Sequence, residues 1–301
     1  NSPYRLSFQD SVLAEDVKYY AVTESKKMYP KEIKPDFPSD LRNPTNSAEY
    51  IIITPTKFKE SEGTLLLEEI WENQGVDVQI VDLQDIFDEF NHGIRSAQSI
   101  KDFLTYAYHN WTIPTLSHVL LLGDGTSDER DFSPEREFNL IPVKHLWSQG
   151  RGKIACDNWY STIIGEDPVP DFALSRIPIW KEEQILEVAN KSQQYIENPN
   201  YEDLWHSKIT LTSGKLENDV PIYAQQSEAL RNNYVPDSYN VNRIYSAITS
   251  SDGEVFGDSC FYGGNSDLLD AINNGTVYAQ FIGHGASQVW GDNNLLNLAD
   301  V

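Results

Sequence analysis

Short apolar runs alternate with stretches of helical periodicity along most of the chain, and this alternation limits the fold more than any other feature. Residues 50–54 form a β-branched run typical of a buried strand. Residues 61–73 carry apolar side chains at helical spacing, with acidic residues on the opposite face. The crossovers are long enough to hold helices, so we expect an α/β fold with a mostly parallel sheet. Further strands are expected at 76–81, 118–122, 159–164, 172–177, 207–212, 241–245 and 277–282, and further helices at 96–108, 181–197, 221–233 and 266–273.

The 301 residues are expected to form a lead-in segment and two subdomains. Residues 1–47 contain a possible strand at 17–23 but are otherwise interrupted by prolines, so we expect an extended segment over the main body. A propeptide or the tail of an upstream domain are the alternatives. The first subdomain is expected at 48–200 and the second at 201–301, with a break at residues 198–200. Residues 126–153 are expected to form a long loop.

The charge balance restricts the partners of this chain. Lys and Arg number 23 against 46 Asp and Glu, which gives a net charge of −23. Such a chain would be repelled by nucleic acid and by an anionic membrane surface. No apolar stretch approaches the ~18 residues of a membrane span. Acidic loops able to hold Ca²⁺ are compatible with this composition.

The candidate catalytic residue is His284, which follows an apolar run at 277–282 and is flanked by Gly283 and Gly285. In open α/β sheets, ligands bind outside the carboxyl ends of the strands, so chemistry is expected at this position. Gly283 would permit a turn, and Gly285 would let a backbone N–H approach a substrate carbonyl oxygen closely. The alternative is a structural histidine that caps a strand.

Several stretches of the chain, taken together and in order, carry a resemblance to a known family. The last is the histidine segment 283–287, followed by Trp290, Leu295-Leu296 and Asp300-Val301. The earlier stretches are 85–91 with 100–104, then 119–125, 157–160 and 170–178. Together they resemble the gingipain-type cysteine peptidases, which belong to the caspase-like group with legumain, separase and clostripain. The resemblance extends over about residues 48 to 301.

The resemblance implies a caspase-like three-layer α/β/α sandwich in two subdomains and a cysteine endopeptidase. Such an enzyme cleaves a protein or peptide substrate through a thioester, using a Cys-His dyad. In the family the nucleophilic cysteine lies on the core strand after the histidine loop. That position would follow Val301, so we expect only the histidine half of the dyad here. A C-terminal continuation or a second chain would supply the thiol, and the chain alone is expected to be inactive.

Other site residues are expected from the same resemblance. The candidates for the acidic residue that orients the histidine are Glu217 and Asp219; the family position falls at Leu216 or, with one inserted residue, at Glu217. Alternatively, Asp219 matches the acid that receives a basic P1 side chain. Solvated loop acids are the alternative for both. Asp157 borders the expected cleft with Trp159, and Trp290 is expected to wall the specificity pocket. Ordinary packing is the alternative for the two tryptophans.

Metal and cysteine chemistry are less defined by the sequence. Asp124, Ser127 and Asp128 form an oxygen-rich loop that would bind a structural Ca²⁺, cap a helix or simply be solvated. No zinc motif is present, and no organic cofactor is expected. Neither Cys156 nor Cys260 has the strand-end context of the family's nucleophile, although Cys260 lies in a loop that could meet His284.

Two alternative functions remain open from the sequence. One is a transpeptidase-like sortase of a bacterial secretion system, and the other is a non-catalytic, calcium-stabilised binding or assembly module. The family resemblance implies a secreted or bacterial cell-surface location for the protein.

Overall fold

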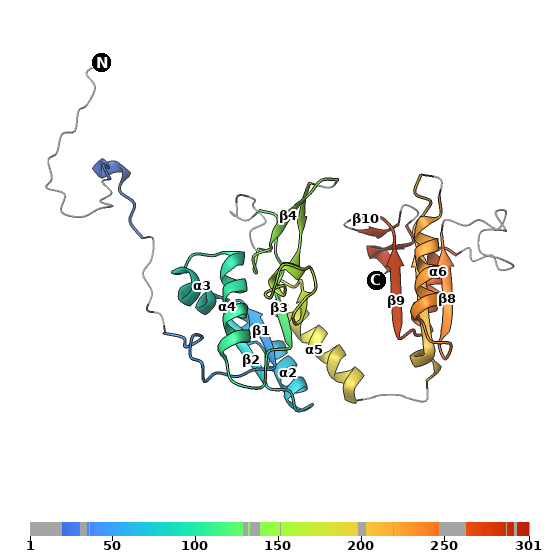
Figure 1. Ribbon diagram of the computed structural model, residues 1–301, viewed down its shortest axis with the longest axis horizontal. Helices are drawn as coiled ribbons and strands as arrows, with labels where there is room; N and C mark the ends of the chain where they lie inside the picture. The colour runs from blue at the N-terminus through green and yellow to red at the C-terminus, as the bar shows by residue number, and fades with distance from the viewer. Residues whose placement is uncertain are drawn as a thin grey trace, which may run out of the picture. The chain divides into compact units, whose positions relative to one another are not determined.

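The computed structural model describes residues 20–30, 35, 37–128, 132, 139–150, 152–197, 203–218, 220–246, 263–286, 288–291 and 294–300. The chain divides into two compact units, residues 1–192 and 193–301 (Figure 1). The break expected at 198–200 lies outside the described residues. Of the strand expected at 17–23, residues 20–23 are described and are not a strand; the short 3-10 helix η1 (Glu24–Lys26) follows them.

The first unit is built on a four-stranded parallel sheet in the order β2-β1-β3-β6. Pairing along the sheet places Ile52 beside Ile80 on one side and beside Leu120 on the other. The mostly parallel sheet expected from the sequence is therefore confirmed. The strands are β1 (Tyr50–Thr54), β2 (Val78–Asp82), β3 (His118–Leu122) and β6 (Ala173–Ile177).

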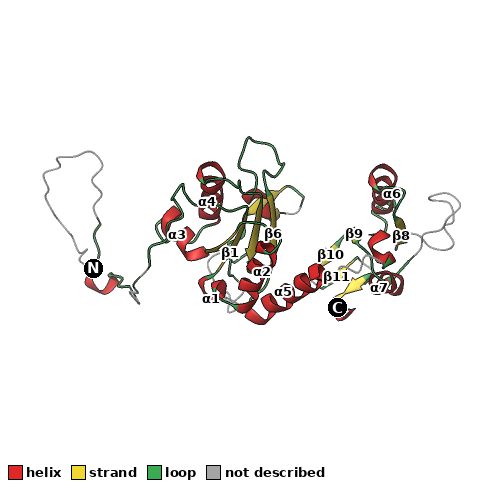
Figure 2. Ribbon diagram, turned by 90° about the horizontal axis from the view of Figure 1, so that it is seen from below, coloured by secondary structure: helices red, strands yellow, loops and turns green. Residues whose placement is uncertain are grey.

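Both faces of this sheet are covered by helices, because alternate side chains of the central strands are buried on opposite sides. Ile51, Ile53 and Leu121 join one apolar cluster with residues of α3 (Leu83–Asn91) and α4 (Ala97–Asn110). Ile52, Leu120 and Leu122 join a second cluster on the other face. That cluster includes α1 (Thr56–Lys59), α2 (Glu62–Glu72) and α5 (Glu182–Glu197). Figure 2 shows these helices around β1, and the unit is a three-layer α/β/α arrangement.

Two local expectations for the first unit are wrong. The segment expected as a loop at 126–153 contains β4 (His145–Ser148), which forms an antiparallel hairpin with β5 (Gly152–Ala155). Instead of a strand at 159–164, the chain forms the 3-10 helix η3 (Asp157–Tyr160). Tertiary contacts override the apolar pattern here, since the buried Tyr160 donates its hydroxyl hydrogen to the Pro142 carbonyl at 2.6 Å.

The second unit contains a three-stranded parallel sheet in the order β8-β7-β9. Ile209 and Leu211 pack with Ala224 of α6 (Ile222–Tyr234) on one face. Ile244 packs with Leu268 of α7 (Asn265–Asn273) on the other face. The strands are β7 (Lys208–Ser213), β8 (Asn240–Tyr245) and β9 (Tyr278–Ile282).

A small antiparallel sheet follows β9. It consists of β10 (Gly285–Ala286), β11 (Val289–Trp290) and β12 (Leu296–Asn297). Short 3-10 helices precede β7 and follow β12, namely η4 (Leu204–Ser207) and η5 (Leu298–Asp300). None of the helices in the described ranges combines the length and apolar character that a membrane crossing requires.

Candidate functional site

The strand ends of β7 and β9 define the candidate site in the second unit. The two strands are parallel neighbours, so the residues after them meet at the same edge of the sheet. The Gly214 N–H donates to the Ile282 carbonyl at 2.9 Å. A Cβ atom on Gly283 would lie 3.0 Å from the backbone N and Cα of Gly214. Gly283 does not adopt a left-handed backbone, so the close approach of the two loops, rather than the expected turn, explains this glycine.

His284, Glu217 and Tyr223 form a closed triangle at this edge. The Nε2 atom of His284 lies 2.9 Å from Oε2 of Glu217 and 2.9 Å from the Tyr223 hydroxyl oxygen. Tyr223 donates its hydroxyl hydrogen to the same Glu217 oxygen at 2.7 Å. The Tyr223 and His284 rings also meet edge to face, with their centroids 5.7 Å apart. The sequence-predicted pair of His284 and Glu217 is thus brought together, and Tyr223 joins it.

A tight turn and a helix start hold these partners in place. Glu217 and Val220 exchange backbone hydrogen bonds at 2.9 and 3.0 Å, around a left-handed Asn218 with φ 50°. Tyr223 is the second residue of α6, which is fixed to the sheet through the fully buried Ala224. Asparagine tolerates a left-handed conformation better than most residues do, which suits it to this turn.

The hydrogen bonds determine which nitrogen of the imidazole can act as a base. A carboxylate only accepts hydrogen bonds, so the contact with Glu217 places the ring hydrogen on Nε2. In the neutral ring the lone pair then lies on Nδ1. The pair is partly open to solvent, since 37% of the His284 side chain and 42% of the Glu217 side chain are exposed. This exposure allows a substrate to reach the ring.

Gly285 offers a backbone donor next to the histidine. It faces Trp290 in the β10–β11 hairpin, and the Gly291 N–H donates to the His284 carbonyl at 2.8 Å. Gly285 and Trp290 are therefore a non-hydrogen-bonded pair, and the Gly285 N–H points away from the hairpin. An exposed N–H beside a histidine is suited to stabilise a developing oxyanion.

Trp290 stands on the same hairpin. Its ring stacks on Phe281 at an interplanar angle of 13° with the centroids 5.4 Å apart. The residue is 40% exposed, so it both packs and presents a surface. It borders a groove of ≈240 Å³ that is also lined by Ala286, Gln288, Val289, Leu296, Asn297 and Leu298.

Asp157 lies in the first unit, where its carboxylate is engaged by Arg176. The guanidinium donates to both carboxylate oxygens at 2.7 and 2.8 Å, and also to the Gly123 carbonyl at 3.0 Å. This bidentate pair holds η3 against β6. The substrate contact expected for Asp157 stays a prediction.

Trp159 packs against the first apolar cluster of the same unit, as its alternative interpretation expected. The ammonium groups of Lys101 and Lys144 lie 4.4 and 4.2 Å from its ring centroid. Burial lowers the pKa of Lys101, and the neighbouring charge of Lys144 lowers it further.

The loop after β3 holds the expected calcium ligands. Asp124 accepts a hydrogen bond from the Gly125 N–H at 2.8 Å, and the Asp128 N–H donates to Thr126 Oγ1 at 3.0 Å. Within the described residues, no group of three or more His, Cys, Asp or Glu side chains could hold a metal ion. Ca²⁺ takes six to eight oxygen ligands, so this donor set does not by itself fit the ion. The calcium site stays a prediction, and no step proposed below uses it.

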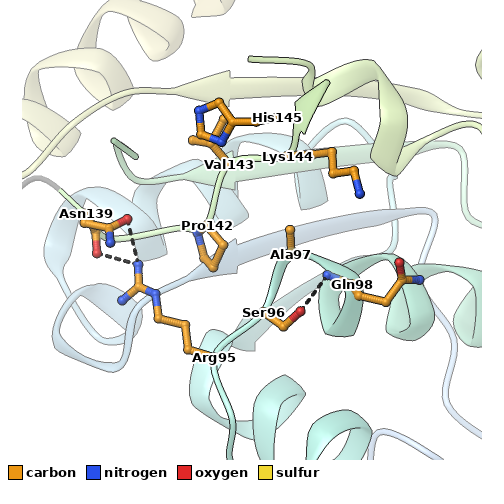
Figure 3. Close-up of a pocket in the computed structure, with 9 residues that line it drawn as sticks. All are labelled: Arg95, Ser96, Ala97, Gln98, Asn139, Pro142, Val143, Lys144 and His145. Atoms are coloured by element: carbon orange, nitrogen blue, oxygen red, sulfur yellow. Dashed lines mark hydrogen bonds between the residues drawn. The ribbon is translucent and has the colours of Figure 1, made fainter. Parts of the chain in front are cut away.

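A basic pocket of ≈340 Å³ lies at the start of α4 in the first unit (Figure 3). Ser96 caps the helix by accepting from the Gln98 N–H at 3.1 Å, and Arg95 donates to the backbone and side-chain oxygens of Asn139. Lys144 and His145 complete the basic part of the lining. The sequence did not indicate this pocket, because residues 95–98 and 139–145 are joined only by the fold.

Three expected residues remain to be placed. Asp219 and Cys260 lie outside the described residues. Cys156 precedes η3, is half-buried and is not in a disulfide. Tyr223 was missed because a tyrosine on a helix carries no motif, and only the pairing of β7 with β9 brings it to the histidine.

The chain is similar to one family of peptidases and, in part, to two solved structures. Residues 43–301 match the model of peptidase family C25. A solved structure described as a protease is similar with a TM-score of 0.53 and 18% identity, over 87% of this chain and 50% of that one. The dimeric latent PorU from Porphyromonas gingivalis is similar with a TM-score of 0.41 and 19% identity, over 50% of this chain and 16% of PorU. The chain thus spans at most half the length of these two proteins, and no curated protein sequence matches it.

Proposed function

The chain belongs to peptidase family C25, and on this premise we propose that it forms the histidine-bearing part of a cysteine endopeptidase. One observation carries the proposal. His284 lies at the carboxyl end of β9 with Nε2 bonded to Glu217, so Nδ1 is the nitrogen that exchanges a proton with a thiol.

The proposed reaction proceeds in successive steps that use His284 and the Gly285 N–H. The thiol gives its proton to Nδ1 of His284, and the sulfur attacks the carbonyl carbon of the substrate. The Gly285 N–H stabilises the negative oxygen of the tetrahedral intermediate. The imidazolium then protonates the leaving amine as the C–N bond breaks, which leaves a thioester. A water molecule, deprotonated by His284, attacks the thioester carbon; the C–S bond then breaks, the imidazolium returns its proton to the sulfur, and the carboxylic acid is released.

The outer edge of β9 supports the proposal that the thiol comes from outside residues 1–301. In the described sheet, β9 is the last strand and pairs with β7. A further parallel strand added to this edge would end beside His284, because parallel strands align their carboxyl ends. A following segment or a second chain would bring the cysteine by this route.

The groove beside Trp290 supports the proposal that a side chain of a protein or peptide substrate binds there. Its aromatic wall suits the apolar stem of a long side chain. A basic P1 residue held by Asp219 belongs to the same proposal. The net charge of −23 suits a secreted or cell-surface protein with a structural calcium ion, and these remain part of the proposal.

The test is hydrolysis of fluorogenic peptides ending in Arg or Lys by the full-length protein. We expect turnover that thiol alkylation abolishes, that His284→Ala abolishes, and that exchange of the exposed His109 for Ala leaves unchanged. Residues 1–301 alone should release no product. Turnover by residues 1–301 alone would overturn the proposal that the thiol comes from outside these residues. If the full-length protein cleaves none of the peptides in a broad library, the proposed peptidase function is overturned.

A second arm of the experiment addresses the fate of the thioester. An amine nucleophile is added and the products are separated by mass. The free acid alone supports hydrolysis as proposed, and an amide as the main product would replace hydrolysis by transpeptidation.

A further inference from the structure

The hydroxyl of Tyr223 has no assigned part in the chemistry described above, although it touches both other members of the triangle. Three short edges of 2.7, 2.9 and 2.9 Å join Tyr223, Glu217 and His284. With a carboxylate and a neutral imidazole, only two hydrogens are available for these three edges, one on the tyrosine oxygen and one on the ring. The placement of these two hydrogens decides the tautomer of His284.

One arrangement satisfies all three groups. Glu217 Oε2 accepts from the Tyr223 hydroxyl and from the Nε2–H of His284, and the tyrosine oxygen offers its lone pairs to the same N–H. In the opposite arrangement, Tyr223 would donate to an unprotonated Nε2. A ring lone pair would then face a carboxylate oxygen at 2.9 Å, with no hydrogen between them. The geometry therefore favours the Nε2–H tautomer.

The exposure of the ion pair explains why a third member is needed. Pairs as open to solvent as Glu217 and His284 hold their geometry weakly, since water competes for both groups. Tyr223 is half-buried and belongs to a helix anchored on the sheet, so its hydroxyl is a fixed donor. The hydroxyl restricts the orientation of the Glu217 carboxylate. The Tyr223 ring restricts the orientation of the imidazole plane through the edge-to-face contact.

We propose that Tyr223 is a positioning residue that orients the Glu217 carboxylate and fixes neutral His284 as the Nε2–H tautomer, with the lone pair on Nδ1. The assignment of Nδ1 as the partner of a thiol rests on the proposed peptidase function. The tautomer itself does not, because Tyr223, Glu217 and His284 all belong to this chain.

The experiment measures the tautomer directly. The chain is labelled with ¹⁵N on histidine, and the ring nitrogen shifts of His284 are read at pH values high enough that the shifts no longer change with pH. His284→Asn identifies the signal. We expect the Nε2–H pattern in the unmodified chain. In Tyr223→Phe the ratio of the two tautomers should shift toward Nδ1–H by about threefold to tenfold, the effect of one lost hydrogen bond.

The matched control is Tyr234→Phe, the same chemical change at the other end of α6 on a side chain that is 78% exposed. It should leave the ratio unchanged. An Nδ1–H pattern in the unmodified chain, or equal ratios in Tyr223→Phe and Tyr234→Phe, would overturn the proposal. Loss of the dispersed amide spectrum in Tyr223→Phe would also contradict it, because the residue would then serve folding rather than the position of the carboxylate.

A kinetic arm separates this proposal from the peptidase function. In the full-length protein, Tyr223→Phe should lower kcat about threefold to tenfold with KM unchanged, since the proposal gives the hydroxyl no contact with the substrate. If the tautomer ratio depends on Tyr223 but the protein has no peptidase activity, the proposed function is wrong and the positioning role stands. Full kcat in the variant would contradict the positioning role and leave the function intact.

Discussion

The Glu217 carboxylate lies 2.9 Å from Nε2 of His284, although 67 positions separate the two residues in the chain. Both follow strands that pair directly, so the sheet register brings the two loops to one edge. In the proposed mechanism, the carboxylate would fix the ring and stabilise the imidazolium that forms when the thiol loses its proton. The following predictions test this site and the fold that holds it.

Exchange of Glu217 for Gln should lower kcat of the full-length protein by about tenfold to a hundredfold. The reason is that the variant keeps the shape of the side chain and loses a hydrogen bond to a charged ring. KM should change little. Steady-state kinetics with a fluorogenic peptide measure the effect, and Glu187→Gln on α5 is the matched control. Equal kcat values for the two variants would remove Glu217 from the mechanism.

Exchange of Gly283 for Ala should displace the histidine loop. The added methyl group would lie 2.7 Å from Phe281 Cζ and 3.0 Å from the Gly214 backbone, so one of the loops must move. We expect a loss of about 1–3 kcal/mol in unfolding free energy from overpacking, and a fall in kcat of about a hundredfold from misplacement of His284. Gly150→Ala, with nothing within 4 Å of the added atom, is the control for both measurements. An unchanged kcat in Gly283→Ala would show that the close approach of the loops does not position the ring.

Exchange of Arg176 for Lys should destabilise the first unit by about 1–3 kcal/mol, because an ammonium group cannot reproduce the bidentate contact with Asp157. Denaturant unfolding measures the difference. Arg231→Lys, on the last turn of α6, should change the unfolding free energy by less than about 0.5 kcal/mol. If the two variants unfold alike, the Asp157–Arg176 pair does not hold η3.

Burial raises the pKa of Tyr50 to about 12, which predicts a pH dependence of stability. The folded state keeps the phenol hydrogen more tightly than the unfolded chain, whose tyrosines titrate near 10. This contribution is fully present below pH ~10 and is lost as the pH rises to ~12, so the unfolding free energy should fall by about 2 kcal/mol across this window. In Tyr50→Phe the fall should be smaller by that amount, whereas Tyr234→Phe should behave as the unmodified chain. Parallel pH curves for all three proteins would show that the partial burial of Tyr50 does not hold the phenol hydrogen in the folded state.

Much of the fold was predictable because it depends on local pattern. The apolar runs at β1 and β3 form buried strands, whereas the run at β9 forms a strand whose residues are exposed or only partly buried. The helical periodicity of α2 and α4 is matched within two residues at each end. Patterns of period two and 3.6 carry this information directly. The hairpin of β4 and β5 was missed because its strands expose Trp147 and Ile154, so the usual alternation of buried and exposed residues is weak.

The site was predictable only in part, for a physical reason. His284 follows an apolar strand between glycines, a pattern that marks a strand end at which ligands bind. Glu217 needed the family resemblance, since an acidic residue in a loop is otherwise solvated. The places of Tyr223 and Gly214 beside the histidine loop depend on contacts between segments far apart in the sequence, and such contacts leave no periodic signal.

The most direct test of the central claim is to label the full-length protein with a peptidyl acyloxymethyl ketone, which alkylates an activated thiol, and to locate the label by mass spectrometry. We predict one labelled cysteine, outside residues 1–301, and a rate of labelling that falls at least about tenfold in His284→Ala and is unchanged in His109→Ala. A label that forms at the same rate in His284→Ala would show that this imidazole does not activate the thiol and would contradict the account.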